Sequence, residues 1–319
     1  MALIQQDRQA VIEVSVIIPV YNAAETISHL ISKILRETRV AIELIIVNDG
    51  STDGTGNLIR DICDNRLILI EQENQGVYAA RNAALDIHRG EWVIFLDADD
   101  DVEDGFIFAR WQTALATQAD VVIFNAWRTG SGTSRTPVHT RQPYGQSLSG
   151  HEWIRHCVTH REWPHYLWLQ IVRSSYVRDN ALHFQTGKSH KDILWTVNLA
   201  IGNARFYLPD IKDYTYRINA ASITHRPDYY DVRAHSYIDV IAEIIRLAEL
   251  KSNKAVRLFL YRHALRETRH FLGLYRNHAY DQSGLKVTFR HRISKVSLAR
   301  GISSISDGVF LLKLILTLL

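Results

Sequence analysis

Up to about residue 126, short apolar runs alternate with stretches of helical patterning. The apolar runs are rich in β-branched residues and comprise VSVII (14–18), ELIIV (43–47), RLILI (66–70), WVIFL (92–96) and DVVIF (120–124). The stretches with helical patterning cover residues 25–36, 54–63, 77–88 and 103–117. This alternation predicts an α/β fold in which helices cover both faces of a mostly parallel sheet.

Polar residues gather directly after three of the apolar runs. PVYN (19–22) follows the first run, NDGSTD (48–53) the second and DADDD (97–101) the fourth. In open parallel sheets, ligands bind beyond the carboxyl ends of the strands. The three clusters therefore predict a ligand site at one edge of the sheet.

The third cluster holds four carboxylates in five residues: Asp97, Asp99, Asp100 and Asp101. Carboxylates packed this closely repel one another unless they are hydrated, paired or bound to a metal ion. The two interpretations are a cation site and a solvated turn that caps the next helix.

Beyond residue 126 the pattern changes. Residues 127–150 are rich in Gly, Ser, Thr and Pro and predict a long loop, which in many proteins is a lid or a binding segment. Residues 151–226 are dense in aromatic residues and His. Residues 232–276 have apolar positions at helical spacing and predict a helical region.

The C-terminal tail combines positive charge with an apolar run. Residues 285–300 carry five Lys or Arg and no acid, and VFLLKLILTLL (309–319) follows after a short interval. This run is interrupted by Lys313 and is too short to span a bilayer, which takes about 20 residues. It either lies in the membrane interface, where anionic lipid attracts the basic stretch by about 1 kcal/mol per charge, or packs as a terminal helix on the protein's own core.

The composition is that of a globular protein of one or two domains, with 319 residues, 46% hydrophobic and 22% charged. Its two cysteines, Cys63 and Cys157, lack metal-ligand spacing and favour a reducing compartment. The N-terminus has no basic region followed by a continuous apolar stretch, so we expect no secretory signal.

The net charge of +3 hides an asymmetry. Residues 1–110 hold 19 acidic and 9 basic residues, whereas the remainder holds 15 acidic and 28 basic residues. The basic part predicts an anionic partner, such as lipid or a phosphorylated glycan. The absence of zinc-ligand spacing and of an RNA-binding signature argues against nucleic acid.

Four segments within the first 125 residues resemble one family: VSVIIPVYN (14–22), ELIIVNDGSTDGT (43–55), QENQGVYAARNAAL (72–85) and GEWVIFLDADD (90–100). In order and spacing they are similar to the inverting glycosyltransferases of family 2, which have the nucleotide-sugar-binding GT-A fold. The resemblance implies a nucleotide-sugar-binding half (1–126), an acceptor-binding half with the catalytic base (127–230) and a helical C-terminal region with a membrane-associating tail (231–319).

In the first half, the resemblance implies a UDP-sugar site with a divalent cation, Mg²⁺ or Mn²⁺. Such an ion prefers oxygen ligands and neutralises the leaving diphosphate as a Lewis acid. Asp99 is the expected direct metal ligand, and Asp97 lies nearer the ribose or the metal's waters. Asp100 and Asp101 are expected to cap a helix or to face the acceptor.

The other donor-binding residues that the resemblance implies are Pro19, Tyr21, Asn22, Asp49, Gly76 and Arg81. Tyr21 and Asn22 would contact the nucleobase and ribose, and Asp49 would accept a hydrogen bond from the uracil imide. Pro19 fixes the exit from the first strand, and Gly76 permits close backbone approach. Arg81 suits a phosphate, with a surface salt bridge as the alternative.

In the second half, SHKDILWT (189–196) matches the segment that holds the family's base. Asp192 is therefore the expected general base for the acceptor hydroxyl, with a helix N-cap as its alternative role. Lys191 departs from the family's usual acidic pair. The implied acceptor-binding residues are Trp168, as a platform for a sugar face, His190 and Arg217; His225 and Arg217 are also candidates to approach the diphosphate.

The acceptor half is most similar to enterobacterial enzymes that add a hexuronic acid to a heptose of the lipopolysaccharide core, through HYLWLQIVRSSYV (165–177) and HKDILWT (190–196). We therefore expect an inverting transfer from a UDP-sugar to a lipid-linked glycan. The expected location is cytoplasmic, peripheral on the inner face of the cytoplasmic membrane.

Two alternatives stay open. The first is a repeat-unit glycosyltransferase for O-antigen, capsule or exopolysaccharide. The second is a non-catalytic nucleotide-sugar-binding scaffold protein anchored by its tail. A sugar nucleotidyltransferase is set aside because PVYNAAET (19–26) lacks a glycine-rich, basic loop.

Overall fold

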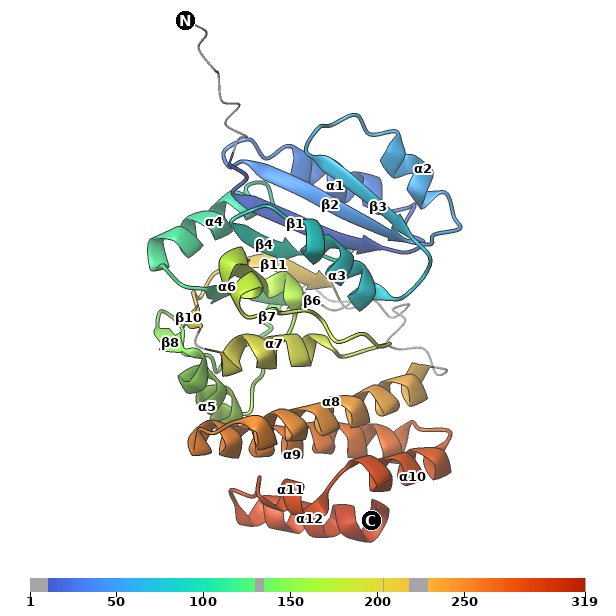
Figure 1. Ribbon diagram of the computed structural model, residues 1–319, viewed down its shortest axis with the longest axis vertical. Coiled ribbons are helices and arrows are strands. Elements are labelled where there is room, and N and C mark those ends of the chain that lie inside the picture. Colours follow the sequence, from blue (N-terminus) through green and yellow to red (C-terminus); the bar gives the residue numbers. More distant parts are fainter. Residues whose placement is uncertain (1–10, 130–134, 203, 218–228, 319) are drawn as a thin grey trace, which may run out of the picture. The chain divides into compact units, whose positions relative to one another are not determined.

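The computed structural model describes residues 11–129, 135–202, 204–217 and 229–318 (Figure 1). The chain forms two compact units, and each is described by itself. The first unit comprises Met1–Phe124 and Leu167–His183, and the second comprises Asn125–Tyr166 and Phe184–Leu319. The functional segments 1–126, 127–230 and 231–319 stay predictions.

The first unit is built around a mostly parallel sheet. Its strands lie in the order β3-β2-β1-β4-β9-β5. Their bounds are β1 Val14–Val20, β2 Ile42–Asp49, β3 Leu67–Gln72, β4 Trp92–Phe95, β5 Val121–Ile123 and β9 Gln170–Arg173. β1 pairs in parallel with β2 and β4, β2 pairs in parallel with β3, and β9 runs antiparallel to β4 and β5. The predicted α/β fold class is confirmed.

Continuous apolar runs form β1, β2, β4 and β5 because both faces of the sheet are covered there, whereas the edge strand β3 is only partly buried. Every residue of β1, β2 and β4 is buried. The helices of this unit are α1 Ile27–Leu35, α2 Thr55–Arg60, α3 Val77–Ile87, α4 Phe106–Thr117 and α6 Ser174–Asp179, with a 3-10 turn at Leu167–Leu169. α3 packs across β1 and β2 (Figure 1).

The strand register brings the polar clusters of the sequence to one edge of the sheet. Val20, at the end of β1, lies opposite Asn48 of β2, and Asp49 lies opposite Gln72 of β3. Ile17 of β1 lies opposite Phe95, the last residue of β4. The segments that follow β1, β2 and β4 therefore leave the sheet at neighbouring positions.

The long loop predicted for residues 127–150 is a partly wrong expectation, because three short strands occur in and beside it. They are β6 Asn125–Thr129, β7 Arg135–Pro137 and β8 Ser147–Ser149. β6 pairs in parallel with β11 (Lys212–Arg217) and antiparallel with β7, and β8 pairs antiparallel with β10 (Arg205–Tyr207). The local sequence did not predict these strands because it is polar and because their partner strands lie up to about 90 residues away along the chain.

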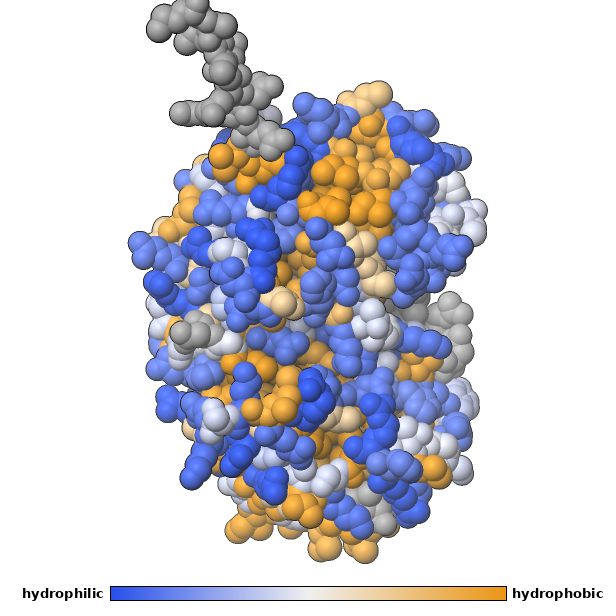
Figure 2. Space-filling view, in the orientation of Figure 1, coloured by the Kyte–Doolittle hydropathy of each residue, from blue (hydrophilic) through white to orange (hydrophobic). Residues whose placement is uncertain are grey.

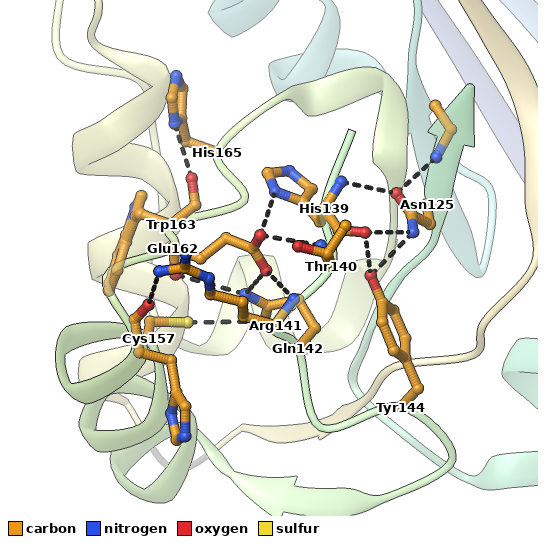
Figure 3. A network of polar contacts seen from close by, with 12 residues as sticks. Asn125, His139, Thr140, Arg141, Gln142, Tyr144, Cys157, Glu162, Trp163 and His165 are labelled. Atoms are coloured by element: carbon orange, nitrogen blue, oxygen red, sulfur yellow. Dashed lines mark hydrogen bonds and ion pairs between the residues drawn. The ribbon is translucent and has the colours of Figure 1, made fainter. Parts of the chain in front are cut away.

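The same segment is also fastened by side chains, as Figure 3 shows. The Glu162 carboxylate accepts hydrogen bonds from the backbone N–H groups of Thr140 and Arg141, both at 2.9 Å, and from Gln142 Nε2 at 3.0 Å. The Asn125 amide donates to the His139 carbonyl at 2.9 Å and accepts from the His139 N–H at 3.1 Å. These bonds satisfy backbone groups that a free loop would leave to water.

The remainder of the second unit is mainly helical. Its helices are α5 Gly150–His160, α7 Asp192–Ile201, α8 Tyr230–Leu250, α9 Lys254–Asn277, α10 Gln282–Arg292, α11 Lys295–Ala299 and α12 Ile305–Leu318. The helical region predicted at 232–276 is thus confirmed as two helices, α8 and α9, which lie side by side (Figure 1). α7 packs on α8, and α10 and α11 pack on the α8–α9 pair.

α12 has two apolar faces. Phe310, Leu311, Leu314 and Leu318 are buried, whereas Ile305, Val309, Leu312 and Leu316 are exposed, with Ile305 at 89% and Leu316 at 78%. Apolar atoms line the edge of the molecule that α12 forms (Figure 2). Within the described part of the chain, no helix is both long and apolar enough to cross a membrane.

Candidate functional site

The acidic cluster after β4 is divided among different partners. Asp97 forms an ion pair with Arg81 of α3 at 2.5 Å, and the Asp100 carboxylate accepts a hydrogen bond from the Asp97 backbone N–H at 2.8 Å. Asp101 forms an ion pair with Lys33 of α1. For Asp99 the described residues offer no such partner, and its side chain is exposed. The cluster therefore leaves one carboxylate available for a ligand.

Although the Asp99 side chain reaches solvent, protein atoms packed around it limit its hydration. This partial burial, followed by the negative charge of Asp97, raises the pKa of Asp99 above its usual value. A divalent cation would relieve both effects, because it supplies the opposite charge and takes carboxylate oxygens as ligands. Asp97 and Asp99 thus fit Mg²⁺ or Mn²⁺. Among the described residues no group of three His, Cys, Asp or Glu converges on a common point, so a cation here would take its other ligands from water or substrate.

Asp49, at the end of β2, ties its strand to the loop before α3. Its carboxylate accepts hydrogen bonds from Gln72 Nε2 at 2.7 Å and from the backbone N–H groups of Gln75 and Gly76, both at 2.8 Å. Gly76 has a φ of 90°, in the region that favours glycine. The loop that precedes Arg81 is therefore held in position by the carboxylate expected to meet a uracil.

The end of β1 is tied to the loop after β2. Asn22, which has a φ of 50°, donates its backbone N–H to Ser51 Oγ at 2.9 Å and accepts from the Thr52 backbone N–H at 2.8 Å through Oδ1. Tyr21 is 51% exposed, and Pro19 is the buried residue of β1 that precedes Val20. Tyr21 therefore presents an aromatic surface to solvent at this edge.

Trp168 lies in the first unit, in the 3-10 turn before β9, and is 5% exposed. Its backbone carbonyl accepts a hydrogen bond from Arg110 Nη1 at 2.6 Å. Arg110 is fully buried and stacks over the rings of Phe106 and Phe124. Little of the Trp168 ring is accessible, and its role as a sugar platform stays a prediction.

In the second unit, Asp192 is the first residue of α7, and its carboxylate lies 3.7 Å from His165 Nε2. The His165 Nδ1–H donates to the Trp163 carbonyl at 3.0 Å, since a carbonyl only accepts. Lys191, which replaces an acid of the family pattern, is almost fully buried and pairs with Asp239 of α8 at 3.1 Å. Lys191 thus fastens α7 to α8 and leaves Asp192 as the carboxylate of the segment.

His190 packs its ring against Tyr237, with the centroids 4.6 Å apart. Burial lowers the pKa of His190 to about 4, so its ring is neutral at pH 7. Arg217 is the last residue of β11, and only its backbone is described. His225 lies outside the described residues.

The expected donor residues thus gather at one edge of the first unit, where Arg81 contacts Asp97 and Asp49 contacts Gly76. His190 and Asp192 belong to the second unit. The sequence reasoning missed His165 beside Asp192, because the two residues are 27 positions apart and nothing local signals their contact. The only available hint was the position of His165 at the start of a segment already linked to the acceptor.

Comparison with known proteins identifies relatives of this architecture. The glycosyl transferase family 2 profile matches residues 15–169. The chain is 29% identical over 257 residues to YibD, an uncharacterized glycosyltransferase of Escherichia coli, and the match spans 78% of this chain and 74% of YibD. It is 30% identical over 221 residues to EpsJ, an uncharacterized glycosyltransferase of Bacillus subtilis, and this match spans 67% of the chain and 63% of EpsJ. The match to GlyA of Streptococcus pneumoniae spans 16% of that relative.

Solved structures with the same fold include residues 1–349 of TarS from S. aureus in complex with UDP-GlcNAc. The TM-score is 0.68 at 18% sequence identity, and the match covers 91% of this chain and 84% of the TarS chain. The mannosyltransferase PcManGT from Pyrobaculum calidifontis, in complex with GDP-Man and Mn²⁺, has a TM-score of 0.55 at 18% identity, with 96% and 80% coverage. The chain thus has a GT-A fold, and its residues 15–169 are similar to the glycosyl transferases of family 2.

Proposed function

We propose that this protein transfers a sugar from a UDP-sugar to a glycan acceptor with inversion at the anomeric carbon. The observation that carries the proposal is the arrangement after β4, where Arg81 pairs with Asp97 and leaves Asp99 as an exposed, crowded carboxylate. This arrangement offers a diphosphate both a cation site and a guanidinium. TarS in complex with UDP-GlcNAc, as a neighbour of the same fold, supports a nucleotide-sugar donor.

Asp99, with Asp97 beside it, would hold the Mg²⁺ or Mn²⁺ ion. The bound ion would supply positive charge for the departing diphosphate. Tyr21 and Asn22 would contact the nucleoside, while Asp49 would orient the base through its remaining acceptor capacity.

Asp192 is the proposed general base. It removes the proton of an acceptor hydroxyl, whose oxygen attacks the anomeric carbon from the face opposite the diphosphate. The bond to the diphosphate oxygen breaks, and the electron pair leaves with UDP. Trp168, His190 and Arg217 are the proposed acceptor-binding residues.

The proposed acceptor is a lipid-linked glycan, the lipopolysaccharide core, with a uronic acid added to heptose. The basic composition beyond residue 110 supports an anionic acceptor. The alternative is a repeat-unit enzyme for an exopolysaccharide. It is supported by the 34% identity over 114 residues to the succinoglycan biosynthesis protein ExoO of Rhizobium meliloti. A panel of acceptors distinguishes the two.

We also propose that α12 holds the protein on the inner face of the cytoplasmic membrane. Its exposed residues Ile305, Val309, Leu312 and Leu316 recur at helical spacing and form one stripe, the α12 stripe. Residues 282–318 contain six Lys or Arg and a single acid, Asp307, which pairs with Arg269 at 2.8 Å. An apolar stripe on a cationic region suits the interface of an anionic bilayer.

The decisive experiment measures binding and hydrolysis of a panel of UDP-sugars, with and without Mn²⁺, for the wild type, Asp99→Ala and Asp104→Ala. Asp104 is a matched control because its side chain is 79% exposed and its ion pair with Arg36 is long, at 3.9 Å. We expect one donor to bind in a metal-dependent manner, about tenfold or more weakly in Asp99→Ala and unchanged in Asp104→Ala. If no UDP-sugar binds and both variants behave like the wild type, the proposal is wrong. Donor binding without turnover on any acceptor supports the scaffold alternative.

A further inference from the structure

A polar groove in the second unit lies between α8 and α9 and belongs to no part of the proposed donor site. Its volume is about 300 Å³. The polar residues that line it are Arg233, Tyr237, Arg269, His270, Asn277 and His278. No Asp or Glu of the described chain lines the groove. It therefore presents guanidinium groups and hydrogen-bond donors, which is the chemistry of an anion site.

Two acids lie near the groove without lining it. Asp307 pairs with Arg269 from outside the groove at 2.8 Å. Burial raises the pKa of Glu267 to about 8, so this side chain is mostly uncharged at pH 7. Burial lowers the pKa of His270, so its ring is mostly neutral at pH 7 and can donate one N–H.

The groove adjoins the candidate base within the same unit. Tyr237 has its ring 4.6 Å from the ring of His190 on one side and 6.2 Å from that of His270 on the other. His190 stands two residues before Asp192 and has a φ of 58°, a conformation that a non-glycine residue keeps only where surrounding contacts hold it. Ring contacts therefore run from the start of α7 to the lining of the groove.

We propose that the α8–α9 groove binds a phosphoryl group of the acceptor glycan and so holds the acceptor beside Asp192. The inference rests on the proposed sugar transfer and names a feature of its acceptor. Arg233 and Arg269 supply charge-assisted hydrogen bonds to phosphate oxygens, and His270 and Asn277 supply further donors. The volume accommodates a phosphoryl group together with part of the sugar that bears it.

The test is a calorimetric titration of the full chain with inorganic phosphate, in the presence of saturating UDP and Mn²⁺ so that the donor site is filled. Arg233→Gln is expected to weaken phosphate binding about tenfold, because it removes a charged donor, and to leave UDP binding unchanged. Arg276→Gln is the matched control, since Arg276 lies on the last turn of α9, is exposed and does not line the groove. His270→Gln is a second groove variant if Arg233→Gln does not fold.

Equal phosphate binding by the wild type and both groove variants overturns the inference, as does an equal loss in Arg276→Gln. Competition arms identify the source of the phosphoryl group. Displacement of phosphate by a hexose 6-phosphate supports a glycan phosphate, whereas displacement by phosphatidylglycerol vesicles alone overturns that assignment in favour of a lipid headgroup. If UDP does not bind the wild type, the donor proposal fails. Phosphate binding that depends on Arg233 would then indicate an anion site unconnected with sugar transfer. That result would overturn the acceptor assignment.

Discussion

Two buried glutamates illustrate how the surroundings of a single residue decide its charge. Glu43, on β2, is 1% exposed, and burial alone would raise its pKa. Hydrogen bonds from Ser15 Oγ and from the backbone and side chain of Arg89 outweigh burial and lower the pKa of Glu43. Glu267, on α9, receives no such hydrogen bond from the described residues, and burial raises its pKa to about 8.

At the residue scale, we expect Glu267→Gln to change how stability depends on pH. The folded wild type keeps a proton on Glu267 up to about pH 8, whereas the unfolded chain loses it above pH 4.5. Between these values the unfolded state binds fewer protons, so the wild type loses stability as pH rises, by on the order of 1 kcal/mol per pH unit. Glu267→Gln has no such loss and should be the more stable protein at pH 8, but not at pH 4.5. Urea unfolding across this pH range measures the difference.

Glu43→Gln provides a comparison of opposite sign. Because the folded pKa of Glu43 is lowered, its contribution to stability is present above pH 4.5 and is lost as pH falls through the folded pKa. Glu43→Gln should therefore be less stable than the wild type at pH 7, with a smaller difference in acid. Parallel pH profiles for the wild type and Glu267→Gln would contradict the burial argument.

At the element scale, local pattern and distant partners contribute differently. α12 was visible in the sequence as an apolar run, but only its packing separates the buried residues Phe310 and Leu314 from the α12 stripe. The segment from Thr140 to Gln142 has no periodic pattern and is held chiefly by the carboxylate of Glu162. A helix such as α12 can therefore be predicted from its own sequence, whereas the conformation of a segment such as 140–142 depends on a distant residue.

We expect Glu162→Ala to lower the free energy of unfolding by about 2–3 kcal/mol, because it leaves two backbone N–H groups and the Gln142 amide without their acceptor. Guanidinium unfolding followed by circular dichroism measures the change. Glu243→Ala is the control, since it removes only the pair with Arg246 one turn away on α8, worth about 0.5 kcal/mol or less. Similar losses in both variants would refute the role given to Glu162.

The α12 stripe makes a second prediction at this scale. The double variant Leu312→Ser/Leu316→Ser should bind phosphatidylglycerol vesicles at least about tenfold more weakly, because it removes two apolar side chains from the contact surface. Its melting temperature should stay close to that of the wild type, since both leucines are exposed. Vesicle sedimentation measures the binding. Leu250→Ser, a change at an exposed leucine of α8, should bind normally; equal binding by all three proteins would exclude the stripe as the anchor.

At the scale of the whole molecule, the two units divide the proposed reaction between them. The proposed donor-binding residues Tyr21, Asp49, Arg81 and Asp99 belong to the first unit, and the proposed base Asp192 belongs to the second. The excess of acidic residues lies within residues 1–110 and the excess of basic residues beyond them, so charge divides along the chain in a similar way. Donor binding and acceptor activation should therefore respond to different substitutions.

We expect Asp192→Asn to lose transfer by about 100-fold or more while it keeps the wild-type affinity for the UDP-sugar, because the amide cannot accept the hydroxyl proton. His165→Gln should lower transfer less, since it removes an imidazole 3.7 Å from the base but leaves the base itself in place. Donor titration and initial rates measured on the same preparations check both results. A loss of donor binding in Asp192→Asn would place this residue in the donor site and contradict its role as base.

The sequence by itself determined the α/β class, the strands β1 to β4 and the edge at which their polar clusters gather. It could do so because a strand covered on both faces needs a continuous apolar run, and because parallel strands all end at the same edge. Only the tertiary structure decided the pairing of β6 with β11, the contact of His165 with Asp192 and the lining of the α8–α9 groove. These features join residues that lie far apart along the chain. Local periodicity predicts which residues are buried, but it does not predict which distant residue each of them contacts.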